Sequence, residues 1–168
     1  MIVIGGAVSP FILRALNEAK MAEGRANLEA IVAGLEKLRA DHGGFVSLAA
    51  YPDPHGLSVA EQLWSVPPCP TACSREGIEG CASFDCVGFH PHGDDAFFSY
   101  ACRVSTDGQA VTCAALGDLD GDGQRSLQVR RRRGPKGEVA PIPSFGGLAP
   151  ECSLSTEATT SRCPEAVY

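Results

Sequence analysis

Residues 9–44, SPFILRALNEAKMAEGRANLEAIVAGLEKLRADHGG, decide the fold of this chain. Within this stretch, apolar side chains recur at spacings of three and four residues, which places them on one face of a helix. They are Leu28, Ile31, Val32, Leu35 and Leu38. Ser9 is a typical N-cap and Pro10 suits the first helical position, while Gly43 can end a helix in the left-handed conformation. We therefore predict one helix from Ser9 to His42, about 50 Å long.

The two parts of this helix differ in character. Its later part is amphipathic, whereas its first third is apolar and follows another apolar run, MIVIGGAV. This apolar segment needs a second surface to bury it, because exposed apolar area is unfavourable in water. The residues that we expect to be buried in this way are Ile2, Val3, Ile4, Val8, Pro10, Phe11, Ile12 and Leu13.

The order of residue types in PFILRA (10–15) and EAKMAEGRANLEAI (18–31) resembles the N-terminal helix of type IV pilins and pseudopilins. The match covers roughly the first 45 residues. The resemblance implies an α+β fold, with a long N-terminal helix (1–44) packed on a small antiparallel β-sheet with disulfide-rich loops. Residues 45–168 would then form the globular α+β domain. A core helix in some other small domain is the alternative that this pattern leaves open.

The sequence departs from the pilin pattern before Pro10. The family's processing phrase, Gly-Phe-Thr-Leu-Ile-Glu after a basic leader, does not occur, and the apolar stretch is shorter than the about 20 residues that span a bilayer. A start codon placed inside the true reading frame, a truncated form and loss of the anchor each account for this. The sequence does not choose among the three.

The resemblance also implies a function and a location. The expected role is a structural subunit, minor rather than major, of a type IV pilus or pseudopilus-like filament serving adhesion, motility or secretion. Its partners would be other pilin subunits and the inner-membrane assembly machinery. The protein would be exported, anchored in the inner membrane before assembly if full length, and then part of an extracellular pilus or a periplasmic pseudopilus.

Composition and motifs argue against other classes of function. The formal net charge is −6, which does not suit nucleic-acid binding. The exception is the run Arg130–Arg133, which we interpret as a solvated patch or as a surface for acidic groups of a neighbouring subunit. We find no nucleophile elbow, phosphate-binding glycine loop or zinc-protease motif, so we expect neither an enzyme nor a small-molecule substrate.

Eight cysteines, all downstream of the long helix, predict a disulfide framework formed in an oxidising compartment. They are Cys69, Cys73, Cys81, Cys86, Cys102, Cys113, Cys152 and Cys163. The first four lie in an irregular insertion (67–93), and the last two lie in a C-terminal loop (134–168). The alternative is a zinc or iron–sulfur site held by the first four, although their C-x3-C and C-x4-C spacings are wider than usual zinc knuckles.

A hairpin follows the cysteine-rich insertion. Ala96–Val104 is rich in aromatic and β-branched residues and predicts a strand, and Asp107-Gly108 predicts a two-residue turn before a return strand over Gln109–Leu116. This turn pairs Thr106 with Gln109 and therefore places Cys102 opposite Cys113, at a hydrogen-bonded pair with Cα atoms near 5.5 Å. A disulfide between them is expected.

Two further features are local. Ser58 and Glu61 form a capping box, so we predict a short helix from Ser58 to Trp64, with the Trp64 ring on the long helix.

Pro141, Pro143 and Pro150 exclude a central strand after Arg133.

The acidic loop Gly117–Gly123, GDLDGDG, carries the chemistry of a metal site. Asp118, Asp120 and Asp122 alternate and can converge on Ca²⁺, with backbone carbonyls completing the shell. The twelfth position is Val129 rather than glutamate, and the flanks predict strands, so this is not an EF-hand. A plain Asp/Gly turn is the alternative.

A second candidate metal site is His90-Pro-His92-Gly-Asp94-Asp95, whose ligand types would suit a transition metal. A second candidate function also stays open. The chain would then be a secreted, calcium-dependent binding module that contacts its target through the cysteine-rich insertion and forms no filament.

Overall fold

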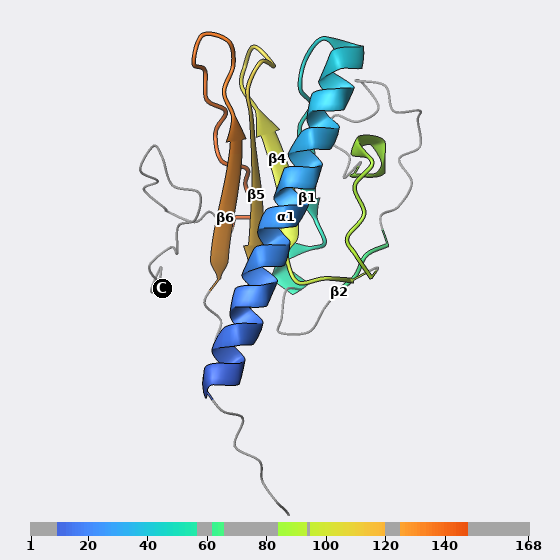
Figure 1. Cartoon of the computed structure of the whole chain (residues 1–168). Helices are drawn as coiled ribbons and strands as arrows, with labels where there is room; N and C mark the ends of the chain where they lie inside the picture. Colours follow the sequence, from blue (N-terminus) through green and yellow to red (C-terminus); the bar gives the residue numbers. More distant parts are fainter. Residues whose placement is uncertain (1–9, 57–61, 66–83, 94, 120–124, 148–168) are drawn as a thin grey trace, which may run out of the picture.

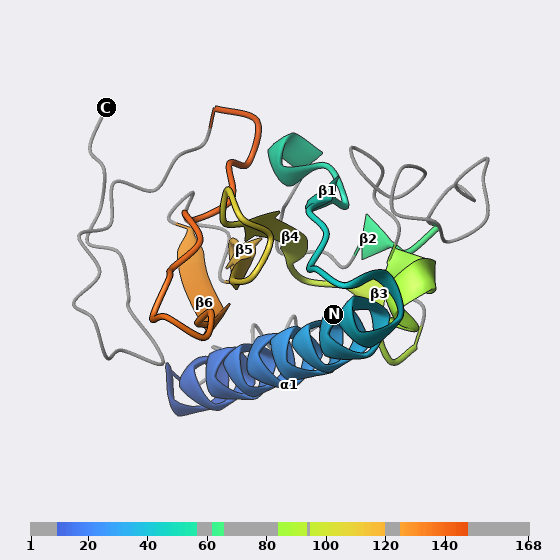
Figure 2. The same ribbon diagram turned by 90° about the horizontal axis from the view of Figure 1, so that it is seen from above.

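The computed structural model describes residues 10–56, 62–65, 84–93, 95–119 and 125–147. Within these ranges one long helix lies across one face of a four-stranded antiparallel sheet, and a two-stranded sheet lies to one side (Figure 1). Seen from above, the helix and the larger sheet form two separate layers (Figure 2). The expected α+β architecture, with a long N-terminal helix on an antiparallel sheet, is therefore confirmed.

The helix, α1, runs from Pro10 to His42 and contains 33 residues. Its described part begins at Pro10; Ser9, the predicted N-cap, lies outside the described residues, so the exact start of the helix stays a prediction. Gly43 ends it with φ +75°, and its N–H donates to the carbonyl of Arg39 at 2.8 Å. All five side chains of the predicted stripe are buried, so the helical face was predicted correctly.

The main sheet has the strand order β1-β4-β5-β6, and every neighbouring pair is antiparallel. Its strands are β1 (Leu48–Tyr51), β4 (Ser99–Val104), β5 (Val111–Gly117) and β6 (Ser126–Arg132). Strand β5 is buried along its whole length because it is central in the sheet and covered on both faces. The acidic loop therefore connects β5 to β6, as the predicted flanking strands require.

The predicted hairpin register is confirmed, but its turn differs. Cys102 lies opposite Cys113 and the two form a disulfide with a Cα–Cα distance of 4.0 Å. This is the short spacing of a non-hydrogen-bonded pair, not the expected 5.5 Å. The reason is the turn: Ser105 accepts from Gly108 N–H and donates to Ala110, so the loop is wider than two residues and the alternation shifts by one position.

Two predicted elements differ in part from the structure. The strand predicted over Ala96–Val104 is interrupted at Phe97 and Phe98, which separate β3 (Asp95–Ala96) from β4. Phe98 is fully buried, and the bend places its ring beside α1, where it lies close to Gly24. The end of the predicted Ser58–Trp64 helix is also a strand, β2 (Gln62–Leu63), which pairs with β3. Pairing with a distant segment replaces the predicted helix at Gln62 and Leu63; both residues of the capping box, Ser58 and Glu61, lie outside the described residues.

The larger core lies between α1 and the sheet and includes an aromatic group around Trp64. Its ring centroid is 5.0 Å from that of Tyr51 and 5.4 Å from those of Phe84 and Phe89, all in edge-to-face geometry. Trp64 thus shares the core with the buried stripe of α1, and its ring contacts are with these aromatic side chains. Such pairs contribute about 0.5–1.5 kcal/mol each beyond burial.

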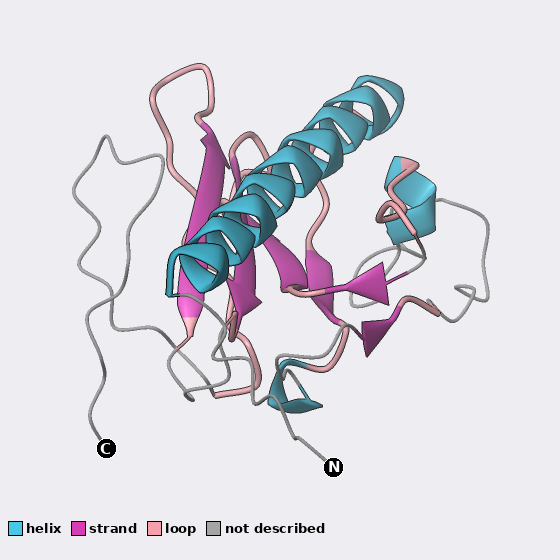
Figure 3. Cartoon of the chain, turned by 60° about the horizontal axis from the view of Figure 1, so that its bottom comes forward, coloured by secondary structure: helices cyan, strands magenta, loops and turns pink. Residues whose placement is uncertain are grey.

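Two further segments complete the packing. The short helix η2 (Phe84–Val87) lies against α1 at Gly34, and η1 (Pro54–Gly56) follows β1. Figure 3 shows the long helix crossing in front of the main sheet. The described part of the C-terminal loop runs along the opposite face (Figure 2) and contributes Phe145 to a second core there. Residues 133–147 contain no strand, in agreement with the prolines at 141 and 143.

Candidate functional site

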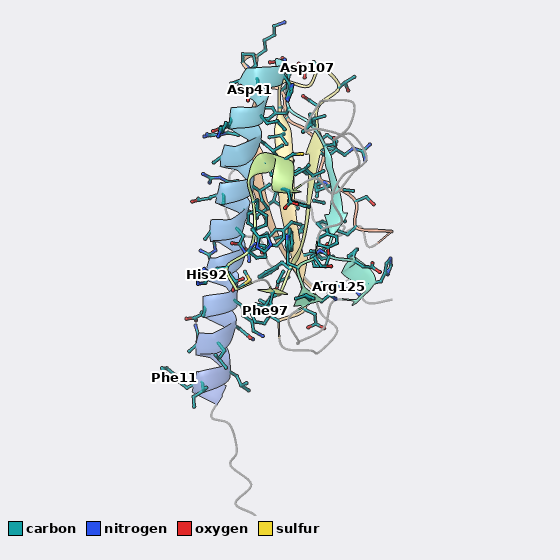
Figure 4. All side chains as sticks on the ribbon, turned by 90° about the vertical axis from the view of Figure 1, so that its right-hand side faces the viewer. Phe11, Asp41, His92, Phe97, Asp107 and Arg125 are labelled. Atoms are coloured by element: carbon teal, nitrogen blue, oxygen red, sulfur yellow. A yellow bond between two sulfur atoms is a disulfide. The ribbon has the colours of Figure 1, made fainter. Side chains whose placement is uncertain are left out.

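The first turns of α1 extend past the end of the sheet. Figure 4 shows Phe11 on this projecting part, and Figure 1 shows the same end of the helix below the strands. Four large apolar side chains here are exposed to solvent: Phe11 (79%), Ile12 (51%), Leu13 (52%) and Leu16 (52%). We call these four residues the apolar tip. Among the predicted assembly residues, Phe11, Ile12 and Leu13 are thus exposed, whereas Ile2, Val3, Ile4 and Val8 lie outside the described residues.

The apolar tip is wider than the stripe of an ordinary surface helix. At about 100° per residue, its four side chains span about 200° of the helix circumference. The polar side carries Arg14 and Glu18, which form an exposed ion pair at 3.0 Å. A helix apolar over more than half of its circumference is typical of one surrounded by several neighbours rather than packed on a single surface.

Beyond the apolar tip, polar contacts fix α1 to the sheet. Asn27 Nδ2 donates to the Tyr100 hydroxyl at 2.8 Å, and Tyr100 is fully buried. Burial raises the pKa of Tyr100 well above its usual range, and the Asn27 hydrogen bond only partly opposes this. Near the other end, Arg39 donates to the Gln109 side chain at 2.8 Å. Sequence reasoning missed these contacts, because nothing local pairs an asparagine with a tyrosine 73 positions away.

The arginine run is only partly a solvated patch. Two of its members face α1: Arg130 lies 3.6 Å from Glu29, and Arg132 forms an ion pair with Glu36. The acidic groups expected on a neighbouring subunit are thus partly supplied by the chain's own helix. Arg133 is exposed, while Arg131 is half-buried and its Nε has no hydrogen-bond partner.

Of the three candidate calcium ligands, only Asp118 is described; Asp120 and Asp122 lie outside the described residues. Asp118 is largely buried at the end of β5. The neighbouring Leu119 carbonyl accepts from Lys20 Nζ at 3.0 Å, and this ammonium lies 4.5 Å from the Phe97 ring centroid. Helix α1 therefore contacts the start of the acidic loop through the Leu119 carbonyl.

The remaining metal candidates receive no support. The described part of the chain contains no group of three or more His, Cys, Asp or Glu side chains placed to hold a metal. This finding covers His90, His92 and Asp95 of the second candidate site, whereas Asp94 lies outside the described residues. Cys86 is disulfide-bonded, which is incompatible with its use as a thiolate ligand in the alternative zinc or iron–sulfur site. Cys69, Cys73, Cys81, Cys152 and Cys163 lie outside the described residues.

Two broader findings bear on the nature of the site. None of the helical segments in the described ranges combines the length and apolarity that crossing a bilayer requires. In comparisons with known proteins, the chain matches no protein-family model, no curated protein and no solved structure at a significant level.

Proposed function

We propose that this chain is a structural subunit, minor rather than major, of a type IV pilus or pseudopilus-like filament. The observation that carries the proposal is the apolar tip, defined above by Phe11, Ile12, Leu13 and Leu16, on a helix whose remaining length is packed on the sheet. The sequence phrase over residues 10–31 supports the same family.

The energetics favour association through this tip. Burying the exposed part of its four side chains would contribute about 5 kcal/mol, taking 1.5–3 kcal/mol for each completely buried side chain. Association costs of similar size offset this value, so one such contact is weak. Because the tip is apolar over a wide arc, several neighbouring helices are needed to cover it. A head-to-tail arrangement that does not close on itself supplies them repeatedly and builds an open filament.

The test uses the complete gene product in the cells that make it. Surface filaments are sheared off, periplasmic filaments are then released from the same cells, and both fractions are probed with an antibody against the globular part. The same antibody labels filaments in electron micrographs. We expect the chain in the filament fraction, and we expect Leu13→Gln combined with Leu16→Gln to remove it. Glutamine retains good helix propensity while removing the apolar surface.

The matched control is Glu18→Gln, on the polar side of the same turns, which should leave the chain in filaments. Circular dichroism of each purified variant checks that the fold is retained. Absence of the wild-type chain from every filament fraction would overturn the proposed function, as would normal assembly of the double leucine variant.

A further inference from the structure

The charges of this chain are separated along its sequence. Residues 125–136 contain six Lys and Arg and no Asp or Glu, a formal charge of +6. Residues 43–102 contain seven Asp and Glu and one Arg, a formal charge of −6. Helix residues 10–42 carry five of each sign and are neutral overall. The net charge of the whole chain hides this separation.

The fold places the described charged residues of these two segments at opposite sides of the molecule. Strand β6 is one edge of the main sheet, whereas β1 is the other edge, with β2, β3 and η2 beyond it (Figure 2). We call Arg131, Arg133 and Lys136 the basic edge, and Asp53, Asp85 and Asp95 the acidic side. Both are at least partly exposed. Sequence separation has therefore become separation in space, across the width of the sheet.

Both surfaces keep charges that the described structure does not neutralise. The nearby Arg130 and Arg132 pair with α1, and Lys136 interacts electrostatically with Asp107, but Arg133 makes no ion pair with any described residue. Asp85 and Asp95 likewise form no ion pair within the described ranges. Charges of one sign gathered at one side repel one another, and an opposite surface on another molecule would relieve that repulsion.

We propose that copies of this chain dock side by side, the basic edge of one against the acidic side of the next. This contact rests on the proposed filament function and supplies its lateral interaction between globular parts. The two surfaces are different patches on opposite sides, so each copy can contact one neighbour through each, which makes the contact head-to-tail. Opposite potentials also fix the orientation of the neighbours and steer their encounter.

The test uses two variants with reversed charges, prepared as purified full chains. Variant one carries Arg133→Glu and Lys136→Glu on the basic edge, and variant two carries Asp85→Lys and Asp95→Lys on the acidic side. Each alone brings like charges together, and we expect self-association measured by sedimentation at low salt to weaken about tenfold relative to wild type. An equimolar mixture restores opposite charges at every contact, so we expect it to recover wild-type association.

A control carrying Arg25→Glu and Lys37→Glu, on the exposed side of α1, should associate as wild type does. Raising the salt should weaken the wild type and the mixture alike, since surface charges are screened beyond about 10 Å at 0.1 M ionic strength. The docking is overturned if either variant associates as wild type does, if the mixture remains as weak as its components, or if wild type stays monomeric at low salt. Because this readout needs no filament, its failure is distinct from absence of the chain from sheared filaments.

Discussion

The contact of α1 with η2 at Gly34 gives the sharpest prediction for stability. A Cβ added at Gly34 would lie 2.0 Å from the Val87 carbonyl oxygen and 2.9 Å from Val87 Cβ. Ordinary van der Waals contact begins at 3.4 Å, so Gly34→Ala must move η2 away from α1 by more than 1 Å. That movement would disturb Phe84, which is fully buried in the core beneath.

Two opposing terms set the size of the effect. Overpacking costs about 1–3 kcal/mol, and the upper value applies here because the obstructing atom is backbone and cannot rotate away. Alanine in a helix interior gains about 1 kcal/mol over glycine. The free energy of unfolding should therefore fall by about 2 kcal/mol, which corresponds to a melting temperature lower by about 4–8 °C for a chain of this size.

Thermal and urea unfolding, followed by circular dichroism, measure this change. The matched control is Ala33→Gly, at the exposed neighbouring position, which should cost only the propensity term of about 1 kcal/mol. Helix propensity alone predicts that Gly34→Ala stabilises the protein. A Gly34→Ala variant as stable as wild type, or more stable, would therefore refute the close packing of η2 on α1.

Three further predictions concern polar groups. Tyr100→Phe removes the hydrogen bond between Asn27 and Tyr100 and should lower the free energy of unfolding by about 1 kcal/mol. A double-mutant cycle with Asn27→Ala should give an interaction energy of the same size between the two residues. An interaction energy of zero would show that the hydrogen bond does not stabilise the fold. Calcium should raise the melting temperature of the wild type, and Asp120→Ala should abolish that rise. If the wild type melts at the same temperature with and without calcium, the acidic loop is a plain Asp/Gly turn. The pKa of Asp107 is lowered, chiefly because its carboxylate accepts from the Ser105 hydroxyl. The ionised Asp107 therefore stabilises the folded chain above the ordinary aspartate pKa of about 3.9, and this stabilisation is lost as the pH falls through the lower folded-state pKa. Asp107→Asn should therefore make the free energy of unfolding less dependent on acid pH. An unchanged dependence in the variant would contradict this assignment.

Local sequence signals determined the elements that depend on neighbouring residues. The end of α1 at Gly43 and its buried stripe follow from capping preferences and a 3.6-residue period, both of which act within a few residues. Pairing of Cys102 with Cys113 followed from counting back from Asp107, because a short hairpin leaves little freedom of register.

Only the tertiary structure decided the contacts between distant segments. The break at Phe98 places its ring close to Gly24 of α1, and β2 pairs with the distant β3; no local pattern encodes either contact. The pairing of Arg130 with Glu29, and the position of β6 at the edge opposite the acidic side, depend on strand order. The run of four arginines does not by itself indicate which of them face the helix. The sheet determines this, because successive side chains of a strand point to opposite faces.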